Sequence, residues 1–293
     1  ADLETTAPNI GSCLIYGNSG LPELTGPLAP DKLVFRAGWE SDDLYLLQNL
    51  RFTGWHRYKS TNAISMIYAG GVFSEEQHDL EKISWLPVGR AQVRDKRIPI
   101  EQLNTFLIPR YGLDRVLIVL VDWFGPYSQD PPYYAAVEHF STSPEMDFSK
   151  TTVADWHGWD FTRSIYFYKN GPTFILDEAN TDRKDQAEIR WHLAEGGRMA
   201  SEKEVFNKAL QMKMILLGQA GGQVVSEEEN GGIQLRYLSP KTGKLQLMMV
   251  LLPREWSQAV VVEYRQENGY FIVVVELDGN ELEYRLSQTS VEI

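Results

Sequence analysis

The sequence is poor in cysteine and in long apolar runs. Cys13 is the one cysteine among 293 residues, which excludes an internal disulfide and a cysteine-based zinc site. The longest apolar candidates, 116–121 and 245–252, have the length of a strand, far below the ~20 residues of a membrane span. No signal peptide opens the chain, and a mature extracellular or periplasmic protein fits this start as well as a cytoplasmic one does.

Positive charge is also scarce. Lys and Arg number 28 against 40 Asp and Glu, so the formal net charge is −12. Such a chain cannot neutralise phosphates on a large scale, which argues against a nucleic-acid partner. An acidic polysaccharide would be repelled at long range as well, so its binding would need a local basic patch.

Aromatic residues and turn signals are abundant, and they indicate β structure. The chain has 8 Trp, 14 Tyr and 12 Phe. Short apolar segments are separated by turns such as Asn268-Gly269 and Asp278-Gly279, which favour tight hairpins. Strands are expected at 33–36, 44–47, 63–68, 187–193, 210–216, 233–238, 245–252, 259–264, 271–277 and 282–286. The apolar run 115–122 is expected to be a strand buried on both faces, with a buried helix as the alternative. The predicted fold is all-β, a large antiparallel β-sandwich.

The predicted domain organisation is simple. Residues 1–31, rich in Pro and Gly, are expected to be an entry or linker segment without a core of its own. Residues 32–293 are expected to form the β-sandwich domain, with a sub-boundary near 195–205. A short helix is expected over 100–106, after Pro99.

Four segments carry a family resemblance. Residues 161–177 predict a hairpin, with two apolar strands around Lys169-Asn170-Gly171 and Asp177 at its end. Residues 187–193 contain Trp-His-Leu, residues 33–39 end in Arg-Ala-Gly-Trp, and residues 68–71 read Tyr-Ala-Gly-Gly. In their order along the chain, these segments resemble the C-terminal β-sandwich domain of heparinase II/III-like polysaccharide lyases, here without the α-helical toroid that precedes it.

That resemblance implies cleavage of a uronic-acid-containing glycan by β-elimination. In this reaction a base removes the C5 proton while the carboxylate is neutralised, and an acid protonates the leaving oxygen. The sequence departs from the family pattern at two positions, because the two histidines of a "G-H-G-H-A-D"-like stretch fall on Arg57 and Lys59. The family's remaining catalytic groups come from the toroid. The resemblance therefore implies that this chain is inactive without an N-terminal α-toroid domain or subunit.

Residues 55–62 are the most chemically varied stretch of the sequence. Arg57 could bind a carboxylate through two hydrogen bonds, Lys59 could add charge, and His56 or Tyr58 could exchange protons. Trp55 would border the same site. The competing interpretation is a polar surface strand in which Trp55 packs and the cations are solvated. We therefore take His56 and Tyr58 as candidate catalytic residues, and the other three as candidate substrate-binding residues.

A second aromatic cluster contains Trp156 and Trp159. Their indole faces could stack on sugar rings, or they could fill the core between two sheets. Arg163 matches the family's arginine and is a further substrate-binding candidate, although an ion pair with Asp177 across the hairpin explains it equally well.

Metal binding has little support in the sequence. Glu76, His78 and His157 are weak candidates for a mixed site, but their spacing fits no compact metal motif. No cofactor is expected, and a structural divalent metal remains open. His192, within Trp-His-Leu, is expected to be a structural histidine.

Two functions remain open at this stage. The first is the β-sandwich part of a lyase-like protein with an acidic polysaccharide or oligosaccharide as partner. The second is a non-catalytic carbohydrate-binding or cell-envelope structural module, in which the ancestral histidines became Arg57 and Lys59.

Overall fold

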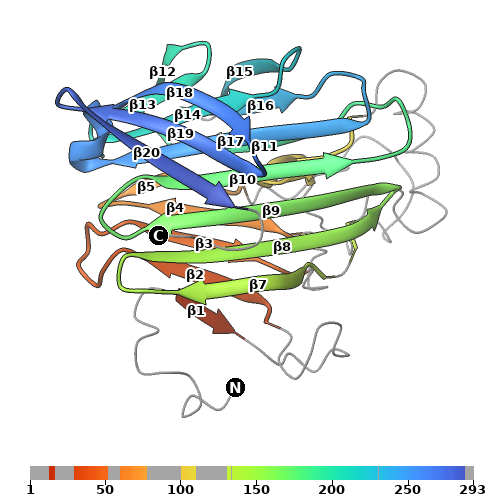
Figure 1. Ribbon diagram of the computed structural model, residues 1–293, viewed down its shortest axis with the longest axis horizontal. Coiled ribbons are helices and arrows are strands. Elements are labelled where there is room, and N and C mark those ends of the chain that lie inside the picture. Colours follow the sequence, from red (N-terminus) through yellow and green to blue (C-terminus); the bar gives the residue numbers. More distant parts are fainter. Residues whose placement is uncertain are drawn as a thin grey trace, which may run out of the picture.

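The computed structural model describes residues 13–16, 30–51, 60–77, 100–109, 131–132, 134–229 and 231–287. Within them lie twenty strands in three antiparallel sheets, which confirms the predicted all-β sandwich (Figure 1). Two short 3-10 helices, η3 (Ile100–Gln102) and η4 (Arg254–Gln258), are the helical elements of this part of the chain. No helix among the described residues is long and apolar enough to span a membrane.

Two large sheets face each other, and a small one lies outside them (Figure 1). The first sheet runs β1 (Cys13–Tyr16), β2 (Lys32–Arg36), β3 (Tyr45–Asn49), β4 (Ala63–Tyr68), β5 (Val72–Glu75), β11 (Glu188–Leu193), β16 (Gly232–Leu238) and β15 (Gln223–Glu229), with β6 (Phe106–Leu107) paired to β11. The second runs β12 (Gly197–Ser201), β13 (Glu204–Asn207), β14 (Met212–Gly218), β17 (Lys244–Pro253), β10 (Thr173–Asn180), β9 (Trp159–Tyr168), β8 (Met146–Trp156) and β7 (Ala136–Thr142). The third contains β18 (Val260–Glu267), β19 (Tyr270–Leu277) and β20 (Asn280–Ser287).

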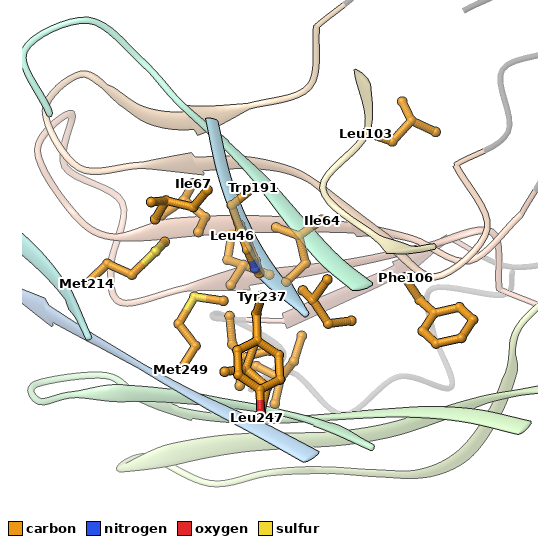
Figure 2. Close-up of a cluster of buried hydrophobic side chains, with 14 of the residues drawn as sticks. Leu46, Ile64, Ile67, Leu103, Phe106, Trp191, Met214, Tyr237, Leu247 and Met249 are labelled. Carbon is orange, nitrogen blue, oxygen red and sulfur yellow. The ribbon is translucent and has the colours of Figure 1, made fainter. Parts of the chain in front are cut away.

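The main core lies between the two large sheets. Figure 2 shows Leu46, Ile64 and Trp191 of the first sheet opposite Leu247 and Met249 of the second, and all five belong to one buried cluster. Alternate strand residues point to opposite faces, so each sheet turns every second side chain into this space.

A second core lies between the outer face of the second sheet and the small third sheet. Phe174, Met248 and Val250 pack there against residues such as Phe271 and Val273. Strand β17 is therefore covered on both faces, which explains its nearly unbroken apolar run. Burial raises the pKa of the Tyr166 phenol, which stays protonated and donates a hydrogen bond of 2.7 Å to the Ser287 carbonyl.

The turns expected from the sequence are present. Asn268 and Gly269 have φ values of 51° and 82°, and Asp278 and Gly279 have 53° and 77°. Two consecutive residues with positive φ fit a type I′ hairpin, so β18, β19 and β20 form a simple meander.

Three sequence expectations differ from the structure. The segment 1–31 contributes a strand, because β1 pairs with β2 from Cys13 to Tyr16. The stretch 195–205 contains β12 and the start of β13, which belong to the second sheet and follow the passage of the chain from β11 in the first sheet; the two sheets share one core. Residues 100–107 form η3 followed by β6 in place of a longer helix. The strand expected at 115–122 lies outside the described residues.

Candidate functional site

The described end of the polar segment 55–62 is deeply buried. Ser60, Thr61 and Asn62 have no exposed surface. The Ser60 hydroxyl donates to the Arg51 carbonyl at 3.2 Å, and the Thr61 hydroxyl donates to the Pro132 carbonyl at 2.8 Å. Asn62 takes the left-handed conformation, with φ at 58°. These contacts fix the point at which the segment joins β4.

Arg163 holds this junction from the opposite sheet. Its Nε and Nη2 donate to the two Asp177 carboxylate oxygens at 2.6 and 2.8 Å, across the β9–β10 pair. Its Nη1 donates to the Asn62 carbonyl at 2.8 Å. The expectation that Arg163 binds substrate is corrected accordingly, because a side chain with 0% exposure has no surface for a glycan. Arg163 is a positioning residue for the main chain at Asn62.

The Asn62 side chain extends the contact between the sheets. Its Oδ1 accepts a hydrogen bond of 2.7 Å from Gln48 Nε2, and it lies 2.8 Å from the hydroxyl of Thr151. Gln48 belongs to β3 in the first sheet and Thr151 to β8 in the second. Asn62 therefore joins β3 of the first sheet to β8 of the second through hydrogen bonds to a single amide oxygen.

A second set of polar contacts leads to His192. Asn104 donates to the Ile64 carbonyl at 2.9 Å, and its Oδ1 accepts from the His192 amide at 2.6 Å. The His192 ring is almost fully buried, and its Nδ1 lies 2.9 Å from Glu229 Oε2. This placement inside β11 confirms the prediction of a structural histidine.

Glu229 also lines an open groove of about 900 Å³ between the β11–β12 turn and the β15–β16 hairpin. The groove carries the carboxylates of Glu195, Glu227, Glu228 and Glu229 and one guanidinium, that of Arg198. Negative charge dominates there, so the groove does not suit the carboxylates of a uronic-acid glycan.

Trp156 and Trp159 both lie in the main core. They flank the turn His157-Gly158, whose φ values of 52° and 83° fit a two-residue type I′ hairpin, and they pair across it. Their exposed fractions are 2% and 0%, and both rings contact Phe106. The expectation that they bind substrate is corrected accordingly, because neither indole face can reach a sugar while the core is closed.

The two described metal candidates, Glu76 and His157, adjoin strands of different sheets. Glu76 is buried beside β5, and His157 occupies the β8–β9 turn, where its carbonyl accepts from Arg183. The described part of the chain contains no group of three His, Cys, Asp or Glu that could hold a metal ion. His78 lies outside the described residues, as do Trp55, His56, Arg57, Tyr58 and Lys59.

No protein-family profile and no curated protein matches the sequence. Solved structures do. The heparinase III BT4657 gene product matches 91% of this chain and 43% of its own, with a TM-score of 0.63 and 14% identity. Heparan sulfate lyase HepC from Pedobacter heparinus matches 89% of this chain and 42% of its own, with a TM-score of 0.65 and 12% identity.

These matches show that the chain has a heparinase-like fold. At identities of 12–14% the likeness is one of fold, and nearly the whole chain shares it. The chain spans less than half the length of either structure. The heparinase-like fold expected from the sequence is thereby found.

Proposed function

We propose that this chain is the β-sandwich part of a polysaccharide lyase-like protein that acts on uronic-acid-containing glycans by β-elimination. The observation that carries the proposal is the fold shared with heparinase III over 91% of the chain. The sequence supports it independently, because the Arg-Ala-Gly-Trp segment, the hairpin at 161–177 and the Trp-His-Leu strand follow one another along the chain.

The chemistry assigned to this chain centres on residues 55–59. Arg57 and Lys59 would neutralise the uronate carboxylate, which makes the C5 proton easier to remove. His56 or Tyr58 would exchange protons with the glycan. The segment leads directly into the junction at 60–62, which Arg163, Gln48 and Thr151 hold in place.

The proposal assigns the other catalytic groups to an α-toroid, on the same protein or on a separate subunit. Both structural neighbours are more than twice as long as the part of them that this chain matches. The alternative is a non-catalytic carbohydrate-binding or cell-envelope module. It would bind the same glycans with the same segment, but no toroid would restore elimination.

Replacing Arg57 and Lys59 together by Ala is expected to abolish binding of acidic glycans and to leave binding of neutral glycans unchanged. The reason is the loss of two charge-assisted contacts to each bound carboxylate. Calorimetric titration with one acidic and one neutral polysaccharide measures the effect. In the matched control, Arg285→Ala is combined with Lys241→Ala. It also removes one arginine and one lysine charge, but from other, exposed positions. Equal loss on both glycans, or no loss, would reject the assignment.

A further inference from the structure

An exposed indole stands in the turn between β2 and β3. Four large apolar side chains are exposed among the described residues, and Trp39 is the most exposed of them at 73%. An indole presents a flat apolar face and a polar N–H, a combination that suits the C–H face of a sugar ring. We propose that Trp39 stacks against a neutral pyranose unit of a glycan chain. This site goes beyond the proposed function, because it requires neither elimination nor a uronate carboxylate.

The indole is held in place from one side. The guanidinium carbon of Arg36 lies over the Trp39 ring at 4.8 Å from its centroid, and over the Tyr45 ring at 4.9 Å. Cation–π attraction stabilises this contact with both rings. Because Arg36 covers one face of the indole, the exposed surface includes the opposite face. A ring that is already immobilised loses little conformational freedom when a ligand stacks on it.

The turn that carries Trp39 is closed by its own hydrogen bonds. The Ala37 amide donates to the Leu44 carbonyl at 2.9 Å, directly beyond the last pair of β2 and β3. The Asp43 carboxylate accepts a hydrogen bond of 2.8 Å from the Glu40 amide. A turn fixed in this way presents the indole in one orientation, as a stacking platform requires.

The charges of the turn favour a neutral sugar. Glu40, Asp42 and Asp43 supply three carboxylates, and Arg36 and Arg254 contact the turn with one guanidinium each. Three negative charges against two positive ones leave a balance of −1, which does not attract a uronate. Glu40 and Asp42 are exposed, so their oxygens can accept hydrogen bonds from sugar hydroxyls beside the ring.

The size of the exposed apolar surface also fits a sugar ring. The other exposed large apolar side chains of the described residues, Val260, Val262 and Leu282, belong to the third sheet, outside the second sheet (Figure 1). A protein partner needs a contiguous apolar patch of at least a few hundred Å², which one indole in the first sheet does not supply. A single pyranose ring matches it.

The indole and the junction at 60–62 lie at opposite ends of β3. Tyr45 pairs with Arg36 at the end next to Trp39, whereas Asn49 pairs with Ala63 at the end next to the junction. Four residue steps of a strand separate these ends by about 13 Å. Trp39 therefore forms a site of its own, and its binding can be measured apart from that of residues 55–59.

The test is calorimetric titration of the full chain with two neutral probes, cellohexaose and chitohexaose. The native chain is expected to bind at least one of them, and Trp39→Ala should weaken that binding about 3- to 10-fold. Trp39→Tyr keeps a flat ring and should retain most of the affinity. The control Leu282→Ala truncates an exposed apolar side chain of the third sheet and should bind like the native chain.

Four outcomes would overturn the inference. They are no binding of either probe by the native chain at millimolar concentration, unchanged affinity of Trp39→Ala, and a loss in Trp39→Tyr as large as that in Trp39→Ala. The fourth is self-association of the native chain that Trp39→Ala abolishes, because a second copy would then cover the indole. Arg57→Ala with Lys59→Ala should bind the neutral probes like the native chain, and a loss there would move the neutral sugar to residues 55–59. Binding of acidic glycans tests the proposed function separately.

Discussion

Replacing Arg163 by Met is expected to lower the free energy of unfolding by about 3–5 kcal/mol, the usual cost of removing one partner of a buried ion pair. The substitution leaves the Asp177 carboxylate, which is 1% exposed, without its cation. It also removes the donor to the Asn62 carbonyl. Urea unfolding followed by tryptophan fluorescence measures the loss.

Two control variants accompany this prediction. Arg163→Met with Asp177→Leu removes both charges and should recover part of the stability, because no unpaired charge is left in the core. Arg285→Met breaks an exposed pair with Glu283 and should change stability little. If Arg163→Met were as mild as Arg285→Met, Arg163 would not hold the junction at 60–62.

Replacing Trp159 by Ala is expected to cost about 3–5 kcal/mol, because it opens a cavity in the main core. Glycan affinity per folded molecule should stay the same, since the indole has no exposed surface. Thermal unfolding and calorimetric titration of the same preparation measure the two effects. The control Trp39→Ala truncates an indole that is 73% exposed and should leave stability nearly unchanged. A variant of Trp159 with native stability and lost glycan binding would contradict the core placement.

The fold could be predicted because its signals are local. Turn dipeptides with positive φ marked the hairpins of β18, β19 and β20. The apolar run 245–252 indicated a strand, and it is β17, which the structure buries on both faces. The hairpin at 161–177 is β9 and β10 with the turn where Lys169-Asn170-Gly171 placed it.

The placement of the tryptophans and of Arg163 could have followed from alternation in β9. Trp159, Phe161, Ile165 and Phe167 share one face and belong to the main core, and Arg163 lies on the same face. The chemical type of each residue suggested a glycan contact, whereas its position in the alternation of the strand did not. That phase favours the core for Trp159 and the buried ion pair for Arg163.

Other parts of the site could not be predicted from the sequence. The contacts of Asn62 with Gln48 and Thr151, and the bridge between Arg51 and Tyr134, join residues far apart along the chain. No local pattern encodes which strands become neighbours. The pairing of β1 with β2 was missed for a related reason, because a four-residue strand among Pro and Gly carries a weak signal.

We propose that this chain contributes the sandwich side of a β-eliminating site. The most direct test is an assay of the chain, alone and assembled with an α-toroid, on a panel of uronic-acid polysaccharides. Absorbance of the unsaturated uronate product reports the reaction. We expect product only when the toroid is present, and less product after Arg57 and Lys59 are replaced. Retained glycan binding with no product in either form would contradict this proposal and leave a binding module.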